Sequence, residues 1–250
     1  MVKLENAYSY DGIESLGYEV GLKCCYMKSG TTKKRGKNRK PLIKSLTLRK
    51  LYSTAKAIYI RSFRFRKELL CWKKKGRPLP PPHLYKQRTV KEYAKVFSIM
   101  TFIETGTYEG AMVEATKTIF NKIYSIELDM TLYKNAKQRF SRFKNITIIQ
   151  GDSRKVLPKL LKSIESPCLF WLDAHYSGGI TAKGELETPI IQELQCILNH
   201  PIKKHVILID DARYFVGQND YPTTEELKKF VLTINPNLVF EIENDIIRIH

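Results

Sequence analysis

The sequence Thr101-Phe102-Ile103-Glu104-Thr105-Gly106-Thr107-Tyr108-Glu109-Gly110 decides the fold. Its first four residues predict a buried strand that ends at Glu104, and its two glycines predict a tight turn. A predicted helix, Gly110–Asn121, and a second predicted strand, Lys122–Glu127, follow directly. A glycine turn lets the backbone approach a ligand, and a carboxylate at the end of the second strand can accept ribose hydroxyls. The stretch therefore predicts a pocket for a nucleotide-like ligand.

The chemistry of this turn narrows the choice of ligand. A P-loop would need Gly-Lys-Ser or Gly-Lys-Thr here, a dinucleotide site would have Gly-x-Gly-x-x-Gly, and neither motif is present. Glu104 would also repel a pyrophosphate group. An acidic strand end suits a cationic nucleoside better, such as S-adenosylmethionine with its sulfonium and amino groups. We therefore expect S-adenosylmethionine as the cofactor.

Strands and helices alternate through the rest of the chain, which predicts a parallel sheet with helices on both faces. The predicted strands are Thr101–Glu104, Lys122–Glu127, Ile146–Gln150, Cys168–Leu172, Val206–Ile209, Leu238–Glu243 and Ile246–Ile249. The predicted helices are Thr89–Phe97, Gly110–Asn121, Met130–Phe140, Arg154–Ile164, Pro189–Asn199 and Thr224–Ile234. A short turn makes the last two strands a hairpin, so one strand runs antiparallel. The predicted fold is a doubly wound α/β fold with a mostly parallel seven-stranded sheet.

Acidic residues follow five of the predicted strands. They are Glu104, Glu127, Asp152, Asp173 and the pair Asp210-Asp211. One acidic residue after a strand is ordinary, because Asp favours turns. In a doubly wound sheet, however, these positions share the edge at which ligands bind, so five together indicate a site.

This ordered set resembles a class I S-adenosylmethionine-dependent methyltransferase over roughly residues 80 to 250. Glu104–Gly110 is similar to the family's glycine-rich motif, Glu127 to its ribose-binding acid and Asp152 to the acid near the adenine. The resemblance is greatest to macrocin-type and polysaccharide-cluster O-methyltransferases, which implies polysaccharide biosynthesis. The cofactor contacts implied are Glu104, Thr105, Gly106, Thr107, Tyr108, Gly110, Glu127, Asp152, Ser153 and Asp173.

Asp173, Asp210 and Asp211 form a second candidate site, because neighbouring strands would bring three like charges together. Three carboxylates are suitable ligands for Mg²⁺, and the resemblance implies a metal ion there that binds sugar hydroxyls. His175 stands at the position of the general base, where that family usually has Asp, and Asp173 is the second predicted catalytic residue. The alternatives are a histidine that caps a turn, and ordinary loop acids. Asp211 alone could instead orient Arg213.

The formal charge of +18 is unevenly distributed. Residues 1–90 hold 23 Lys and Arg against 5 Asp and Glu, whereas residues 91–250 hold 20 of each. We predict a basic N-terminal extension, 1–82, that ends in a proline-rich spacer, and a methyltransferase domain, 83–250. Residues 33–77 combine basic and apolar residues, which is typical of a segment that binds an anionic membrane surface. A helix packed on the domain, a solvated tail and a nucleic-acid-binding arm are the alternatives.

Five cysteines without a paired spacing, and a start without an apolar segment, favour a cytoplasmic protein with peripheral membrane contact. The expected function is O-methylation of a hydroxyl on a sugar or polyol, with a small-molecule or lipid-linked saccharide as acceptor. One alternative is ribose methylation of RNA, although nucleic acid is the less favoured partner because Asn/Asp-Pro-Pro-Tyr is missing after Leu172. A second alternative is a binding protein without catalysis. The identity of the acceptor and the oligomeric state stay open.

Overall fold

The computed structural model describes residues 66–173 and 188–250. Two expectations lie wholly or partly outside these ranges: the basic extension, of which residues 1–65 are not described, and the predicted general base His175. Within the described ranges, no helix has both the length and the apolar character needed to span a bilayer.

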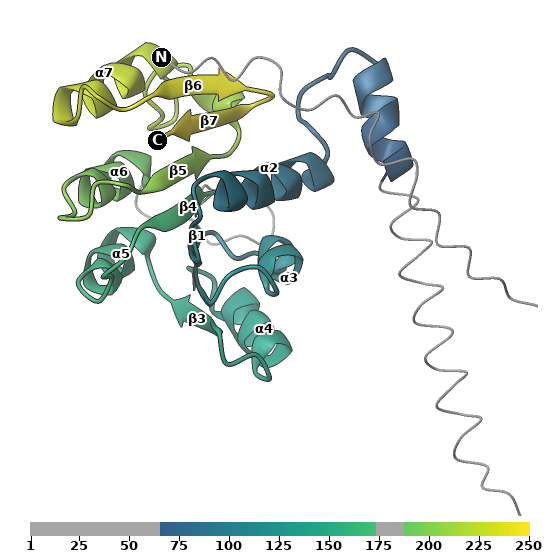
Figure 1. Ribbon diagram of the computed structural model, residues 1–250, viewed down its shortest axis with the longest axis vertical. Coiled ribbons are helices and arrows are strands. Elements are labelled where there is room, and N and C mark those ends of the chain that lie inside the picture. Colours follow the sequence, from purple (N-terminus) through teal and green to yellow (C-terminus); the bar gives the residue numbers. More distant parts are fainter. Residues whose placement is uncertain (1–65, 174–187) are drawn as a thin grey trace, which may run out of the picture. The chain divides into compact units, whose positions relative to one another are not determined.

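Seven strands form one sheet in the order β3-β2-β1-β4-β5-β7-β6 (Figure 1). The strands are β1 Thr101–Thr105, β2 Lys122–Glu127, β3 Ile146–Gln150, β4 Cys168–Leu172, β5 Val206–Ile209, β6 Phe240–Glu243 and β7 Ile246–Ile249. The first five run parallel, and β7 lies antiparallel between β5 and β6. The predicted fold class and the terminal hairpin are therefore confirmed. This arrangement is the one that the resemblance to class I methyltransferases implied.

The helices follow the predicted order with some shifted ends. They are α2 His83–Val96, α3 Ala111–Thr116, α4 Met130–Phe140, α5 Ser153–Leu161, α6 Ile190–Leu198 and α7 Thr224–Ile234. A further helix covers residues 66–74. The helix predicted for Gly110–Asn121 is shorter than expected, because the chain leaves α3 after Thr116 through a turn before entering β2.

The helix predicted for Thr89–Phe97 begins earlier than expected, at His83. Pro82 precedes it, and a proline is compatible with a helix start because the first N–H groups of a helix have no partner within it. The first turn carries Tyr85, whose ring lies 5.0 Å from the ring of Trp72. The side-chain nitrogen of Trp72 in turn donates a hydrogen bond to the carbonyl of Pro78 at 2.7 Å.

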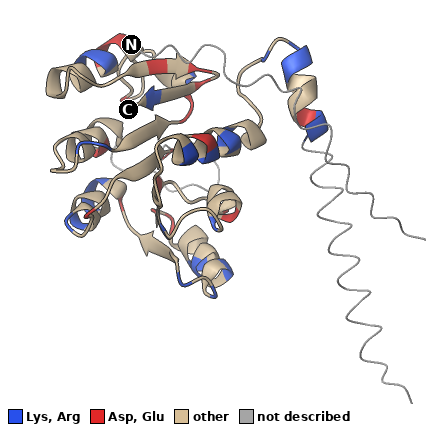
Figure 2. Ribbon diagram, in the orientation of Figure 1, with Lys and Arg blue, Asp and Glu red and all other residues tan. Residues whose placement is uncertain are grey.

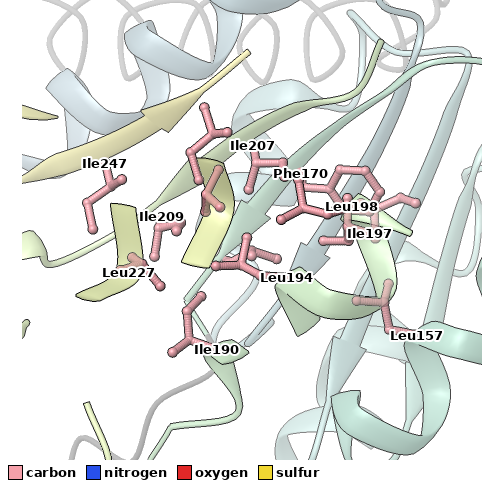
Figure 3. Packing of buried hydrophobic residues seen from close by; sticks show 14 of the residues in the cluster. Leu157, Phe170, Ile190, Leu194, Ile197, Leu198, Ile207, Ile209, Leu227 and Ile247 are labelled. Carbon is pink, nitrogen blue, oxygen red and sulfur yellow. The ribbon is translucent and has the colours of Figure 1, made fainter. Parts of the chain in front are cut away.

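Two apolar layers hold the sheet between its helices. Ile103 and Phe170 face α5, α6 and α7, where Leu157 and Leu194 are completely buried (Figure 3). Phe102 faces the other way, toward α2, α3 and α4. Neighbouring residues on a strand point to opposite faces, so a strand buried on both sides is apolar at consecutive positions. Every residue of β1 and β4 is buried, as expected of neighbouring strands in the interior of the sheet.

Candidate functional site at the carboxyl edge of the sheet

The register of the sheet gathers the predicted acidic residues at one edge. Thr105 pairs with Ile126 on β2 and with Leu172 on β4, so the residues that follow these strands are neighbours. The backbone N–H of Asp173 donates to the carbonyl of Thr105 at 3.0 Å, and the N–H of Asp210 donates to that of Leu172 at 3.1 Å. The predicted clustering at the carboxyl ends is therefore correct.

The turn after β1 depends on two glycines. Gly106 and Gly110 have φ values of 89° and 72°, in the left-handed region that costs a side chain most. The N–H of Gly106 donates to the carbonyl of Ile126 at 2.9 Å, which fixes the turn against β2. A Cβ at Gly110 would lie 2.6 Å from Cε2 of Phe140 on α4. Gly110 is thus required both by its backbone angle and by close packing.

The carboxylate of Glu127 binds the backbone of this turn. Its Oε2 accepts a hydrogen bond from the N–H of Tyr108 at 2.7 Å, and its Oε1 accepts one from the N–H of Asp129 at 2.9 Å. Burial raises the pKa of Glu127, while the two backbone donors act against that rise. A carboxylate has roughly four lone-pair sites, so acceptor capacity remains for ribose hydroxyls. Glu127 therefore fits the ribose-binding role expected of it, and it also organises the turn.

Glu104 is enclosed rather than exposed on the edge, with 2% of its surface accessible. The hydroxyl of Ser125 on β2 donates to its Oε2 at 2.5 Å, and Thr107 lies 2.6 Å from the same hydroxyl. Burial, together with the charges of Asp173 and Glu127, raises the pKa of Glu104 to about 8. Glu104 is therefore mostly protonated at neutral pH. Thr105 beside it is also completely buried.

Asp152 and Ser153 lie where β3 passes into α5. Asp152 caps α5 by accepting from the N–H of Arg154 at 3.0 Å, and the guanidinium of the same arginine binds both of its oxygens. Although partial burial acts to raise it, the pKa of Asp152 is lowered by these interactions with Arg154. Ser153 is buried and interacts with Glu193 of α6. Whether Asp152 contacts an adenine stays a prediction.

Glu193 is a site residue that the sequence reasoning missed. It is 2% exposed, and burial raises its pKa to about 7. Its Oε1 has no regular hydrogen-bond partner among the described residues, so a protonated carboxyl or a polar ligand atom would satisfy the site. The sequence contains a pattern that could have identified this buried residue. Four positions at spacings of 3, 4 and 7 share one helix face, namely Ile190, Glu193, Leu194 and Ile197. A carboxyl within an apolar stripe is the exception that indicates a buried role.

Asp173, Asp210 and Asp211 meet as predicted, with one oxygen of each within 4.8 Å of the others. The sequence indicated Arg213 as a partner of Asp211 but gave no sign of Lys86. Nζ of Lys86 lies 2.6 Å from Oδ2 of Asp210 and 3.0 Å from Oδ1 of Asp211. Arg213 donates to Asp211 at 2.9 Å and also bonds Asp245, so the alternative of Asp211 orienting Arg213 is confirmed.

These contacts bear directly on whether a divalent ion fits. Three of the four oxygens of Asp210 and Asp211 accept hydrogen bonds, because the N–H of Asp211 also donates to Oδ1 of Asp210 at 2.8 Å. An ion at the shared oxygens would lie next to the ammonium of Lys86 and be repelled by it. As arranged here, the cluster does not fit Mg²⁺, and the predicted metal stays untested.

One predicted site residue falls outside the described residues. His175, the predicted general base, lies in the segment 174–187. Trp171, near the end of β4 and two residues before Asp173, is 2% exposed and belongs to the core.

Solved structures resemble this chain in fold, but its sequence matches no known family. No protein-family model matches the chain, and no curated protein matches it. The structures that resemble it include the O-methyltransferase TomG from Streptomyces achromogenes, in complex with S-adenosylmethionine, at 12% identity and a TM-score of 0.48. That match covers 74% of this chain and 86% of TomG.

An O-methyltransferase from Bacillus cereus is similar at 11% identity and a TM-score of 0.48, over 74% of this chain and 88% of that one. The 23S rRNA methyltransferase ErmE is similar at 16% identity and a TM-score of 0.41, over 65% of this chain and 67% of that one. Likenesses at this level carry no argument about reaction or substrate.

Proposed function

We propose that this chain is an S-adenosylmethionine-dependent methyltransferase that methylates a hydroxyl of a sugar or related polyol. One observation carries the proposal: the glycine turn after β1 is closed by Glu127 of β2, and Glu104 and Asp173 lie beside it. A nucleoside ribose would meet the carboxylate of Glu127, and a cationic donor group would meet negative potential at the same edge.

The proposed chemistry needs little from the protein beyond placing two substrates and removing a proton. When bound, S-adenosylmethionine supplies a methyl group that is already activated by its sulfonium. The acceptor oxygen forms a bond to the methyl carbon while the carbon–sulfur bond breaks, and its electron pair stays on sulfur. We assign the hydroxyl proton to His175, which follows Asp173 by two residues. Glu104 is too enclosed to reach an acceptor.

Aromatic and charged side chains beside the aspartate cluster support a ring-shaped acceptor with hydroxyls. The rings of Tyr214 and Tyr221 lie 6.0 Å apart, and Arg213 packs over Tyr214 at 4.5 Å. Burial raises the pKa of Tyr221, and the charges of Asp211 and Asp173 raise it further. Sites that hold small molecules are typically lined by aromatic and apolar side chains, with a few polar groups that fix the orientation of the ligand. A lipid-linked saccharide is the form of acceptor that a basic, membrane-facing extension would suit.

A second candidate is ribose O-methylation in RNA, which the excess positive charge of residues 1–90 favours. Filter binding of the full chain to RNA across a salt series separates the two acceptors. Tight binding at physiological salt would favour RNA, and its absence would leave the saccharide.

Titration calorimetry of the full chain with S-adenosylmethionine and S-adenosylhomocysteine tests the donor. We expect one site with affinity in the micromolar range, for which the two ligands compete. A well-folded protein that binds neither would contradict the proposal and favour a binding protein that has the fold without the activity.

A further inference from the structure

Lys86 lies at the centre of the three-aspartate cluster although it comes from a distant part of the sequence. It stands on the first turn of α2, and its two partners follow β5, 124 and 125 residues later. The Lys86 side chain is 14% exposed, and those of Asp210 and Asp211 are 4% and 10% exposed. An ion pair this enclosed is little screened by salt, so its geometry is held more firmly than that of a surface pair.

The backbone around Lys86 is fixed by contacts on both sides. The hydroxyl of Tyr85 accepts hydrogen bonds from Asn244 at 2.6 Å and from Arg248 at 3.2 Å, which attach the start of α2 to the β6–β7 hairpin. One turn later, Val90 is completely buried against the sheet. The ammonium is therefore placed by a packed helix rather than by a loop.

The charges around the cluster are consistent with a permanent cation. Burial by itself would lower the pKa of Lys86, but the charges of Asp210 and Asp211 outweigh it and raise the pKa above its ordinary value. Burial and the charge of Asp173 hold the pKa of Asp210 well above its usual range. Asp211 behaves oppositely: despite its burial, Lys86 and Arg213 lower its pKa. An ammonium with a raised pKa cannot serve as a general base at neutral pH, but it can serve as a fixed positive charge.

We propose that Lys86 is the resident cation of the Asp173–Asp210–Asp211 cluster and takes the position that a divalent metal ion would otherwise fill. The cluster then needs no metal, because Lys86 and Arg213 offset two of its three negative charges from within the chain. A second role of Lys86 rests on the function proposed above. Lys86 puts a positive charge beside the acceptor and stabilises the acceptor oxygen as that oxygen loses its proton. Lys86 is then a positioning and electrostatic residue, and the proton still goes to a separate base.

Manganese binding, followed by electron paramagnetic resonance, tests the proposal without any knowledge of the acceptor. We expect full-length wild-type protein to leave the spectrum of Mn²⁺ unchanged up to millimolar metal. Lys86→Met removes the charge but keeps a side chain of similar length, and should create one site that binds Mn²⁺ at least about tenfold more tightly than wild type, since the repulsion is gone. The double variant Lys86→Met/Asp211→Asn should lose that site again. Lys95→Gln, an exposed change on the same helix, is the control and should behave as wild type.

The proposal is overturned if wild-type protein binds one Mn²⁺ and Asp211→Asn abolishes that binding. It is also overturned if folded Lys86→Met binds no more metal than wild type. Calorimetry with S-adenosylhomocysteine on the same samples separates the two proposals, because loss of the donor site would leave the metal result unaffected.

A second measurement uses the wild-type chain, so it tests the proposal even if Lys86→Met fails to fold. Brief acetylation of the wild-type chain, read by mass spectrometry, should modify Lys95 and spare Lys86. Added Mg²⁺ should not change that pattern. Acetylation of Lys86 that rises with Mg²⁺ would mean that the metal displaces the lysine, which contradicts a resident cation.

Discussion

Glu127 shows how one residue can serve both the fold and the proposed ligand. Its two oxygens accept backbone hydrogen bonds from Tyr108 and Asp129, and so connect the turn after β1 to the turn after β2. The lone pairs that remain are the ones a ribose would use. A change at Glu127 should therefore affect cofactor affinity and the stability of the turn together.

We expect Glu127→Ala to weaken binding of S-adenosylhomocysteine by roughly 1–3 kcal/mol, the cost of losing charge-assisted hydrogen bonds. Glu109→Ala is the matched control, since Glu109 is exposed in the same turn and should leave the affinity unchanged. Titration calorimetry measures both. Equal affinity in the two variants would remove Glu127 from the pocket.

Glu104 gives a prediction about pH. The pKa of Glu104 is about 8 in the folded chain, compared with 4.5 for an ordinary glutamate side chain. Folding therefore favours the protonated form. The stability that Glu104 contributes is therefore fully present below pH 4.5, declines as the pH rises and is lost above about 8. Glu104→Gln, which is neutral throughout, should gain in free energy of unfolding relative to wild type as the pH rises. One pKa unit corresponds to about 1.4 kcal/mol, so urea unfolding can resolve the difference. Parallel stability curves for the two proteins would contradict the assignment.

At the scale of the element, the turn between β1 and α3 depends on the absence of a side chain. Gly110 precedes α3 with φ 72° and packs under the ring of Phe140, which belongs to α4. The start of α3 and the end of α4 therefore meet at one position that has no room for a methyl group.

Gly110→Ala should lower the free energy of unfolding by more than the roughly 1–2 kcal/mol that a left-handed backbone costs. Gly76→Ala is the control, because Gly76 has φ 80° and a Cβ there would meet nothing within 4 Å. The excess loss in Gly110→Ala measures the clash with Phe140 in urea unfolding. If both variants lose the same amount, Phe140 moves aside without cost.

The start of α2 could not be predicted from the sequence of that helix alone. The apolar spacing that predicts a helix starts at Thr89, whereas the first turn of α2 holds Tyr85 and Lys86, which look like surface residues. Both are fixed by partners that follow β5 or lie in the β6–β7 hairpin. Nothing within the local sequence indicates those partners, so the earlier start could not be predicted.

At the scale of the whole molecule, charge is divided unevenly along the chain. In the described part, Lys and Arg lie mainly on helices, including the helix over residues 66–74 (Figure 2). Its last turn carries the exposed lysines Lys73 and Lys74, and the exposed Lys75 follows it directly. A basic surface of this kind attracts lipid headgroups at roughly 1 kcal/mol per residue near an anionic bilayer.

We expect the full chain to sediment with vesicles that contain phosphatidylserine, and to be released by added salt. Replacing Lys73, Lys74 and Lys75 with Gln should weaken the binding. The control replaces the exposed Lys155, Lys159 and Lys162 of the α5 region, which is the same change in charge, and should have a smaller effect. Binding to RNA but not to vesicles would instead support the nucleic-acid alternative.

The sequence by itself determined the order and type of the elements, because apolar runs and glycine turns are local signals. It also determined that the acidic residues share one edge, since parallel strands bring their carboxyl ends together. Only the tertiary structure decided which distant side chains the acids meet: Glu104 meets a serine of β2 in a closed interior, and Asp210 and Asp211 meet the ammonium of Lys86. Lys86 lies more than a hundred residues from Asp210 and Asp211. Packing chooses such a partner and leaves no periodic pattern in the chain.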